Sequence, residues 1–337
     1  MSQHSILSKV SSSLIPHTAF ERAKTRILAH YAASKECREP FCLAVVGESR
    51  TGKSRVLEHV GSTHPTVRAK TGVHIPILII SAPSKPTVKS LAEILLCELG
   101  DPMWNSRGSE NEKTERLIIL LKRTGTTMVI IEEFQHFYDK TSHKIQHHVA
   151  DWLKILVDRA RLGLVVSGLP ECTAVISQNE QLSGRFSGAI EMPRFDWTEV
   201  SHNNDFKLIL GAFRDALPTY GFPDLSSENM VFRFYCATGG LIGYMVKIFK
   251  ETLLKAEAEG RMSVSLGDLA IGYQDAIWQC RQRTIFNPFL VDFDPTPSPY
   301  ILDLAREVGT KETQMEPQVQ YANYKPAEIT AAEALAK

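Results

Sequence analysis

The chain lacks the features that mark membrane-embedded, secreted or zinc-binding proteins. No stretch of its 337 residues is apolar for long enough to cross a bilayer, and the N-terminus has no apolar core of a signal peptide. The six cysteines include no Cys-x-x-Cys pair, which argues against a disulfide framework and against a zinc site. We therefore expect a soluble cytoplasmic protein with reduced thiols and no membrane contact.

The chain also has no net charge, because 38 Lys and Arg residues balance 38 Asp and Glu residues. This balance disfavours a strongly basic nucleic-acid coat, although a local basic surface is compatible with a sum of zero. The apolar fraction of 43% and the charged fraction of 23% are typical of a globular protein. The length allows two or three domains with a large core, and we find no internal repeat.

One stretch near the N-terminus predicts a nucleotide site. An apolar run at Cys42–Val46 predicts a buried strand, and a glycine-bearing loop and a helix follow it. The loop has the G-x-x-x-x-G-K-[ST] pattern of a phosphate loop, in the strand-before and helix-after context that the pattern needs. Backbone N–H groups and the helix N-terminus would hold the phosphates of ATP. The loop consists of Gly47, Glu48, Ser49, Arg50, Thr51, Gly52, Lys53 and Ser54.

Two loop side chains and two later carboxylates predict the chemistry of the site. Lys53 would reach the β- and γ-phosphates, and the Ser54 hydroxyl would ligate Mg²⁺. A predicted strand at 127–131 delivers Glu132 and Glu133 to its end. We expect Glu132 to hold the Mg²⁺ shell and Glu133 to orient and deprotonate the attacking water.

The order of the predicted strands favours a particular sheet. One buried strand, at 75–81, lies along the chain between the phosphate-loop strand and the acidic strand. We interpret it as a strand inserted between the two, which is the pattern of ATPases that couple hydrolysis to motion. With further strands at 162–167 and 189–192, we predict an α/β fold with a five-stranded parallel sheet.

Two later residues could complete the site. Ser167 ends the fourth predicted strand, where its hydroxyl could contact the γ-phosphate or the lytic water; an ordinary strand end is equally compatible. Arg185 precedes the fifth strand, where it would face the nucleotide of a neighbouring subunit in a ring, as an arginine finger does. The alternative for Arg185 is a surface salt bridge.

The pattern divides the chain into four parts. Thr18 and Glu21 fit a capping box at the start of a helix that precedes the phosphate loop, and this helix either contacts the adenine or only packs on the core. Beyond the sheet we expect lid helices at roughly 203–216, 227–237, 241–259 and 266–283. The predicted parts are an arm at 1–17, an α/β nucleotide-binding core at 18–196, an α-helical lid at 197–285 and a proline-rich, weakly structured tail at 286–337.

These motifs in this order resemble the AAA+ superfamily and, more closely, the TniB/TnsC family of transposition ATPases. The resemblance covers about residues 10–285. Besides the phosphate loop, it rests on four motifs. They are Val129-Ile130-Ile131-Glu132-Glu133-Phe134-Gln135-His136, Val165-Val166-Ser167-Gly168-Leu169-Pro170-Glu171, Gln181-Leu182-Ser183-Gly184-Arg185-Phe186 and Met192-Pro193-Arg194-Phe195.

The resemblance implies a Mg²⁺-dependent ATPase that assembles as a homo-oligomeric ring or filament on double-stranded DNA without reading its sequence. Such proteins link a TniQ-like target selector to the transposase. It also implies that Lys53 and Ser54 are Walker A residues, that Glu132 and Glu133 are Walker B residues, and that the finger is Arg185. By the same resemblance Ser167 is the first sensor.

The chain departs from the AAA+ pattern at two places. Glu132 stands where Asp is usual, and the third lid helix has no second-sensor arginine, for which Lys247 is the nearest substitute. Two other functions therefore stay open, an initiator-like DNA loader and a slowly hydrolysing ATP-dependent switch. DNA-facing loops could include Lys85, Lys89, Arg107, Lys113, Lys140 or Lys144.

Overall fold

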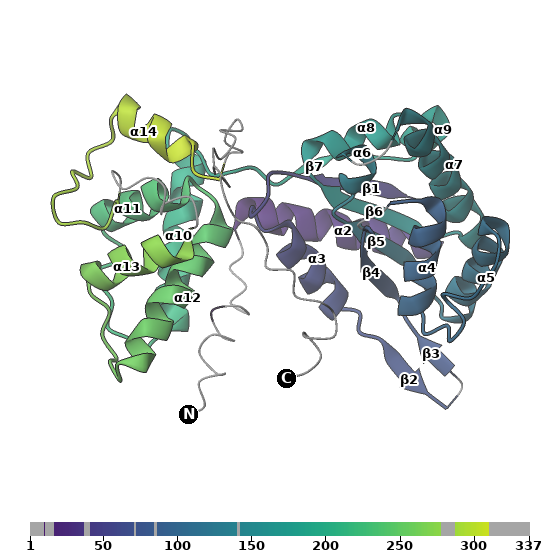
Figure 1. Cartoon of the computed structure of the whole chain (residues 1–337), viewed down its shortest axis with the longest axis horizontal. Helices are drawn as coiled ribbons and strands as arrows, with labels where there is room; N and C mark the ends of the chain where they lie inside the picture. Colours follow the sequence, from purple (N-terminus) through teal and green to yellow (C-terminus); the bar gives the residue numbers. More distant parts are fainter. Residues whose placement is uncertain are drawn as a thin grey trace, which may run out of the picture.

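The computed structural model describes Val10 and residues 17–36, 41–70, 72–83, 86–139, 142–277 and 287–309. The described chain forms an α/β half and a helical half that lie next to each other (Figure 1). Most of the predicted N-terminal arm lies outside the described residues, as do Lys85 and Lys140. No helix of the described part is long and apolar enough to cross a membrane.

A five-stranded parallel sheet in the order β4-β5-β6-β1-β7 organises the α/β half. Its strands are β1 Cys42–Val46, β4 Ile77–Ser81, β5 Met128–Glu132, β6 Gly163–Gly168 and β7 Ile190–Glu191. The predicted fold class is thereby confirmed, and a strand is indeed inserted between the phosphate-loop strand and the acidic strand.

The inserted strand is not the one that we expected. It is β6, whereas the strand predicted at 75–81 is β4 at the edge of the sheet. Burial explains the difference, because every residue of β6 is buried while β4 ends in an exposed Ser81 and carries a half-buried Ile79. Order along the chain therefore did not give order across the sheet.

Helices cover both faces of the sheet. Alternate side chains of β5 divide between two apolar layers: Val129 and Ile131 belong to one, and Met128 and Ile130 to the other. The second layer packs under α2 and α3, and the first under α4, α5 and α7. The helices of this half are α2 Thr18–Glu36, α3 Lys53–Ser62, α4 Val88–Glu98, α5 Glu110–Arg123, α6 His136–Asp139, α7 His143–Ala160, α8 Thr173–Ile176 and α9 Glu180–Ser183, with a 3₁₀ turn at Pro170–Cys172.

The start of α2 differs from the predicted capping box. Thr18 is the first helical residue, and its backbone N–H and its hydroxyl donate to the two carboxylate oxygens of Asp205, at 3.1 and 3.0 Å. Asp205 belongs to α10, Val200–Ala216, in the helical half. Thr18 therefore bonds to Asp205, a partner distant in the sequence, instead of forming the predicted capping box with Glu21. This contact joins α2 to the helical half.

A small antiparallel hairpin, β2 Val67–Ala69 and β3 Gly72–His74, was not predicted. It lies at the lower end of the α/β half in Figure 1 and pairs with no strand of the main sheet. Both strands are exposed along their whole length and are only 3 residues long, which is too short for an alternating pattern to reveal a strand.

The helical half contains the four predicted lid helices. Besides α10, they are α11 Glu228–Thr238, α12 Ile242–Ala258 and α13 Leu266–Ala276. Residues 278–286, where the fourth helix was predicted to end, lie outside the described residues. Stacked aromatic rings fill the core of this half, with Phe249 at 4.9 Å from Phe213 and at 5.2 Å from Phe234.

The prediction of a weakly packed tail is wrong for 287–309. Phe289 is 1% exposed and meets the ring of Phe234 edge-on at 4.9 Å. A further helix, α14 Pro299–Arg306, begins after the Ser298 cap and packs on α11. The crowded prolines misled the prediction because one of them, Pro299, occupies the first turn of a helix, where proline is favourable. Residues 310–337 lie outside the described part of the chain.

We expect Phe289→Ala to destabilise the protein by about 3–5 kcal/mol, because truncating a buried Phe removes apolar contacts and leaves a cavity. Urea unfolding followed by circular dichroism measures this change. Val291→Ala is the control, because Val291 is 90% exposed and its truncation should change the unfolding free energy by less than about 0.5 kcal/mol. Equal effects of the two variants would show that 287–309 does not pack on the lid.

Candidate nucleotide-binding site

The phosphate loop joins β1 to α3 in a tightly confined path. A Cβ atom at Gly47 would lie 2.2 Å from the carbonyl oxygen of Met192, so only glycine fits there. Gly52 has a φ of +99°, which glycine adopts without strain. The Nζ of Lys53 donates to the carbonyl oxygens of Gly47 and Glu48, at 2.8 and 2.6 Å. The ammonium group therefore lies over the loop, where it can meet phosphate oxygens.

The end of β5 places a carboxylate against the first turn of α3. Oε1 of Glu132 is buried and has no hydrogen-bond partner among the described residues. Burial raises the pKa of Glu132, although a hydrogen bond from the Ser54 side chain opposes the rise. A buried acceptor without a partner next to a hydroxyl is a fitting donor set for Mg²⁺, which prefers oxygen ligands. Ser54 and Glu132 are the residues that would hold the metal, and this assignment stays a prediction.

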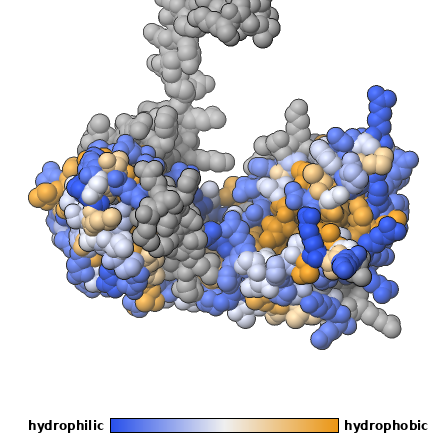
Figure 2. Space-filling view, turned by 90° about the horizontal axis from the view of Figure 1, so that it is seen from below, coloured by the Kyte–Doolittle hydropathy of each residue, from blue (hydrophilic) through white to orange (hydrophobic). Residues whose placement is uncertain are grey.

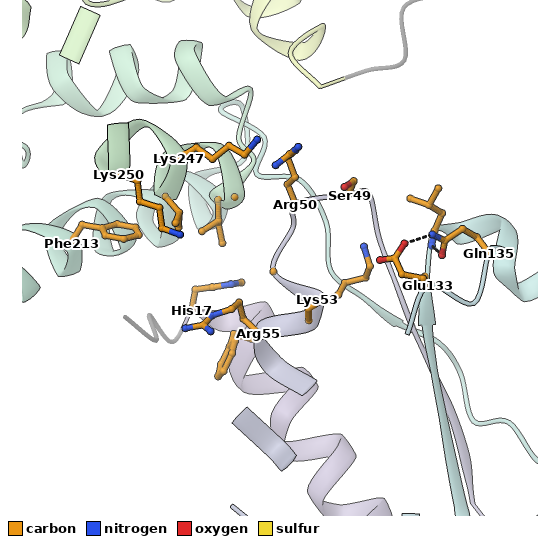
Figure 3. Close-up of a pocket in the computed structure, with 18 residues that line it drawn as sticks. His17, Ser49, Arg50, Lys53, Arg55, Glu133, Gln135, Phe213, Lys247 and Lys250 are labelled. Carbon is orange, nitrogen blue, oxygen red and sulfur yellow. Dashed lines mark hydrogen bonds between the residues drawn. The ribbon is translucent and has the colours of Figure 1, made fainter. Parts of the chain in front are cut away.

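Glu133 is held in a fixed direction beside the loop. Its φ is +54°, in the left-handed region, and its Oε2 accepts a hydrogen bond of 2.6 Å from the Gln135 side chain. Gln135 is buried, and its own oxygen accepts from the N–H of Leu169 at 3.2 Å. Figure 3 shows Glu133 pointing toward Lys53. The sequence motif contained Gln135, but nothing in the pattern revealed that it orients the carboxylate.

A cavity of about 690 Å³ lies between the phosphate loop and the helical half. Figure 3 shows Lys53, Glu133 and Gln135 on one side of it and His17, Phe213 and Lys250 on the other. The cavity is lined by His17, Phe20, Ser49, Arg50, Gly52, Lys53, Ser54, Arg55, Glu133, Gln135, Gly168, Leu169, Phe213, Ile242, Gly243, Val246, Lys247 and Lys250. The charged side suits phosphates, and the aromatic side suits a base.

His17 and Phe20 contribute uncharged rings to the aromatic side of the cavity. His17 is 6% exposed, and burial lowers its pKa to about 4, so the ring is neutral at neutral pH. Its Nδ1 has no hydrogen-bond partner among the described residues. Of the two interpretations of α2, the structure favours the one in which the start of this helix lines the nucleotide cavity.

The helical half contacts the phosphate loop directly. The N–H of Gly243 at the start of α12 donates to the carbonyl oxygen of Arg50 at 3.0 Å, and the Arg50 guanidinium lies 4.6 Å from the centre of the Tyr244 ring. Lys247 and Lys250 line the cavity from the same helix. Lys247, which we named as the nearest substitute for the second-sensor arginine, thus lines the cavity. Sequence analysis did not identify Lys250 as a lining residue.

Arg194 is a further residue whose role sequence analysis missed. It is 13% exposed and pairs with Glu48 of the phosphate loop at 2.6 Å. The same guanidinium donates to the carbonyl oxygens of Gly239 at 3.0 Å and Val308 at 2.8 Å. Gly239 follows α11, and Val308 follows α14. One side chain therefore joins the loop to two segments of the helical half, and the Met-Pro-Arg-Phe motif was its only sequence signal.

Six predicted site residues are not among those that line the cavity: Gly47, Glu48, Thr51, Glu132, Ser167 and Arg185. Ser167 is 1% exposed and lies on the same face of the sheet as Glu132, but it is not among the lining residues. Arg185 pairs with Asp158 at 2.6 Å and donates to the carbonyl oxygen of Gln181 at 2.8 Å. Its own carbonyl oxygen accepts from the N–H of Cys42, at the opposite end of β1 from the phosphate loop.

The fold and the site together define a P-loop nucleotide-binding protein of the AAA+ class. The parallel sheet with an inserted strand, the phosphate loop, the acidic strand end and the helical half that closes over them all belong to this class. Such a fold implies nucleotide binding and ATPase activity.

The chain belongs to the TniB family, a bacterial family of transposition ATPases, because the model of the bacterial TniB protein matches residues 6–197. Comparison with curated proteins gives no match. Among solved structures, the fold is similar to that of Cdc6p from Pyrobaculum aerophilum, with a TM-score of 0.60 and 14% identity over 80% of this chain and 71% of that one. It is also similar to the Aeropyrum pernix ORC2 protein in its ADPNP-ADP complexes, with a TM-score of 0.60 and 14% identity over 81% and 73%. At these identities the two structures show the fold alone.

We expect Mg²⁺-dependent nucleotide binding to weaken in mild acid. Because burial raises the pKa of Glu132 above its ordinary value of 4.5, this carboxylate takes up a proton at a higher pH than an exposed Glu and then no longer attracts the metal. Titrations of ATP with and without Mg²⁺ between pH 4.5 and 7.5 measure the effect. Glu132→Gln should remove this pH dependence, and an unchanged profile in that variant would contradict the assignment.

We expect Arg194 and Glu48 to act as one unit. Arg194→Gln removes the link between the loop and the helical half and should weaken ATP binding by about tenfold, or ~1.4 kcal/mol. The double variant with Glu48→Gln should be no weaker than Arg194→Gln alone, because residues of one network give non-additive losses. Isothermal titration of all three variants gives the coupling, and strictly additive losses would contradict a shared role.

Proposed function

We propose that this protein is an ATP-dependent regulator of DNA transposition that assembles as a homo-oligomer on double-stranded target DNA. One observation supports this most: the phosphate loop and the oriented Glu133 line one cavity, and the half-buried Glu132 lies against Ser54 of the same loop, in a chain of the TniB family. ATP and Mg²⁺ are the proposed ligands. The function requires the protein to be where its target DNA is, which in bacteria is the cytoplasm.

The proposed chemistry assigns each residue a separate task. Lys53 neutralises charge on the β- and γ-phosphates, and Ser54 and Glu132 hold Mg²⁺, which bridges the phosphates. Glu133 accepts the proton of the attacking water while Gln135 keeps the carboxylate in place. Ser167 lies one strand away from Glu132 on the same face, which is compatible with a contact to the reacting phosphate after a small rearrangement.

The position of Arg185 favours action on a neighbouring subunit. Five residues of β1 separate its contact at Cys42 from the phosphate loop, which corresponds to about 15 Å at the usual rise per residue. Arg185 therefore has no route to the nucleotide of its own chain. The Asp158 side chain of this ion pair is 30% exposed. Ion pairs in contact with solvent stabilise a protein by only about 0–1 kcal/mol. Exchanging this carboxylate for a neighbour's phosphate would cost little.

The proposed partners follow from the family. The protein would hold duplex DNA without reading its sequence and would connect a TniQ-like target selector to the transposase. Assembly in a ring or a filament would place each nucleotide between two copies of the chain, with Arg185 supplied by the second copy. Hydrolysis would then weaken the contact between copies and release the DNA.

Electron microscopy of the full chain with duplex DNA and a slowly hydrolysed ATP analogue tests the proposal. We expect rings or filaments only when both DNA and the analogue are present. A protein that stays monomeric and does not bind DNA at saturating ATP would contradict it. Assembly with negligible ATP turnover in the presence of DNA would favour the alternative of a slowly hydrolysing switch.

Two substitutions separate catalysis from assembly. Glu133→Gln should bind ATP, lose hydrolysis by at least about 100-fold and accumulate as assembled complexes. Arg185→Ala should bind ATP normally but lose both hydrolysis and assembly, because the positive charge is missing from the neighbouring site. Arg159→Ala is the matched control, since Arg159 also pairs with a surface carboxylate, Glu115. Full hydrolysis by Arg185→Ala would overturn the finger assignment.

A further inference from the structure

The β2–β3 hairpin lies within the longest part of the chain without acidic residues. No Asp or Glu occurs between Glu58 and Glu93, although the chain has 38 of them. This interval contains the hairpin with its two cations, Arg68 and Lys70. On a surface that carries cations and no carboxylates, the positive charges are not neutralised by neighbouring negative charges, so the surface attracts anions.

The hairpin is fixed to the end of α5. The Nδ1 of His74 and the carbonyl oxygen of Thr124 are 2.9 Å apart, and the N–H of Ile75 donates to the same oxygen at 2.9 Å. The His74 ring also lies against Gly125, where a Cβ atom would approach it to 2.6 Å. The base of the hairpin is therefore held by the helix end, and the two form one continuous surface.

The same helix end adds two further cations. Lys122 and Arg123 in the last turn of α5 are exposed, as are Arg68 and Lys70. No ion pair joins any of the four to a carboxylate of the described residues. Lys122 and Arg123 also complement the C-terminal end of the helix dipole, but the hairpin cations have no such partner. We name these four residues the hairpin surface.

Apolar side chains protrude from the same hairpin. Val67 is 52% exposed and Val73 is 39% exposed, and they project from opposite faces because Val73 pairs with Arg68 in the register. Figure 2, which views the molecule from below, shows an apolar area on the α/β half crossed by long hydrophilic side chains. A two-stranded hairpin alone is marginally stable in water, so exposed valines on it suit a ribbon that packs against a partner.

We propose that the hairpin surface binds the backbone of duplex DNA, with the β2–β3 ribbon lying along a groove. The major groove of DNA admits a two-stranded ribbon, and the four cations would then face phosphates on either side of it. The valine on the face turned toward the groove would contact sugars and base edges without selecting a sequence. This inference rests on the proposed function, because it names the part of the chain that contacts the DNA.

One of the lysines that the sequence offered for DNA contact is excluded by its burial. Lys113 is 2% exposed, pairs with Glu93 and donates to the carbonyl oxygens of Trp104 and Ser106, so it holds a loop in place. Lys89, Arg107 and Lys144 are exposed and remain competing sites. The hairpin surface differs from them because it lies at the amino end of β4, away from the nucleotide cavity.

The test measures binding of fluorescent duplex DNA to the full chain, with a slowly hydrolysed ATP analogue, over a range of salt concentrations. Arg68→Gln/Lys70→Gln should lower DNA affinity at least tenfold and reduce the slope of log affinity against log salt by about 2, because two phosphate contacts are lost. ATP binding without DNA should be unchanged. Lys207→Gln/Arg214→Gln removes two cations from α10, the half-buried Lys207 and the exposed Arg214, and should leave both the affinity and the slope unchanged.

Val67→Ser/Val73→Ser separates groove contact from charge, since it should weaken DNA binding while leaving the salt slope intact. If the wild type binds DNA and Arg68→Gln/Lys70→Gln binds with the same slope, the hairpin proposal is overturned while the proposed function stands. The hairpin proposal also fails, and the proposed function again stands, if only Lys89→Gln/Arg107→Gln reduces the slope. A wild type that does not bind duplex DNA at all overturns both proposals.

Discussion

The structure depends on placing one ammonium group and two carboxylates at the same edge of a parallel sheet. Lys53 lies close enough to Glu132 and Glu133 to interact with both charges, because β1 and β5 run in the same direction and β6 separates them by one strand. Burial lowers the pKa of Lys53 and raises that of Glu132, so each charge is costly in the absence of a ligand. A triphosphate with Mg²⁺ supplies the opposite charges and relieves both costs.

The helical half is connected to this edge at three places. Thr18 bonds to Asp205, the carbonyl of Arg50 accepts from Gly243, and Arg194 joins Glu48 to the segment after α14. All three connections lie around the nucleotide cavity or next to it. The phosphate loop and the helical half are therefore joined by direct bonds, and any coupling between hydrolysis and assembly would require such a connection.

Sequence reasoning predicted the local parts of this arrangement well. The phosphate loop and the acidic strand end are fixed by residues adjacent in the chain, and the strand at Cys42–Val46 was predicted to the residue. It did not predict what depends on distant partners: the inserted strand, the anchoring of Thr18, and the contacts of Gln135 and Arg194. It also missed the packing of Phe289, because a single buried aromatic in a proline-rich stretch leaves no periodic signal.

The segment that follows the lid has a consequence for any attempt to shorten the protein. The boundary that composition alone indicates, near residue 286, would remove Phe289 from the aromatic stack and Val308 from the guanidinium of Arg194. A trimmed chain would lose both lid packing and the support of Glu48, so its nucleotide site would be altered by a cut far away in the sequence. The shortest chain that keeps the nucleotide site intact therefore extends past the last recognisable motif.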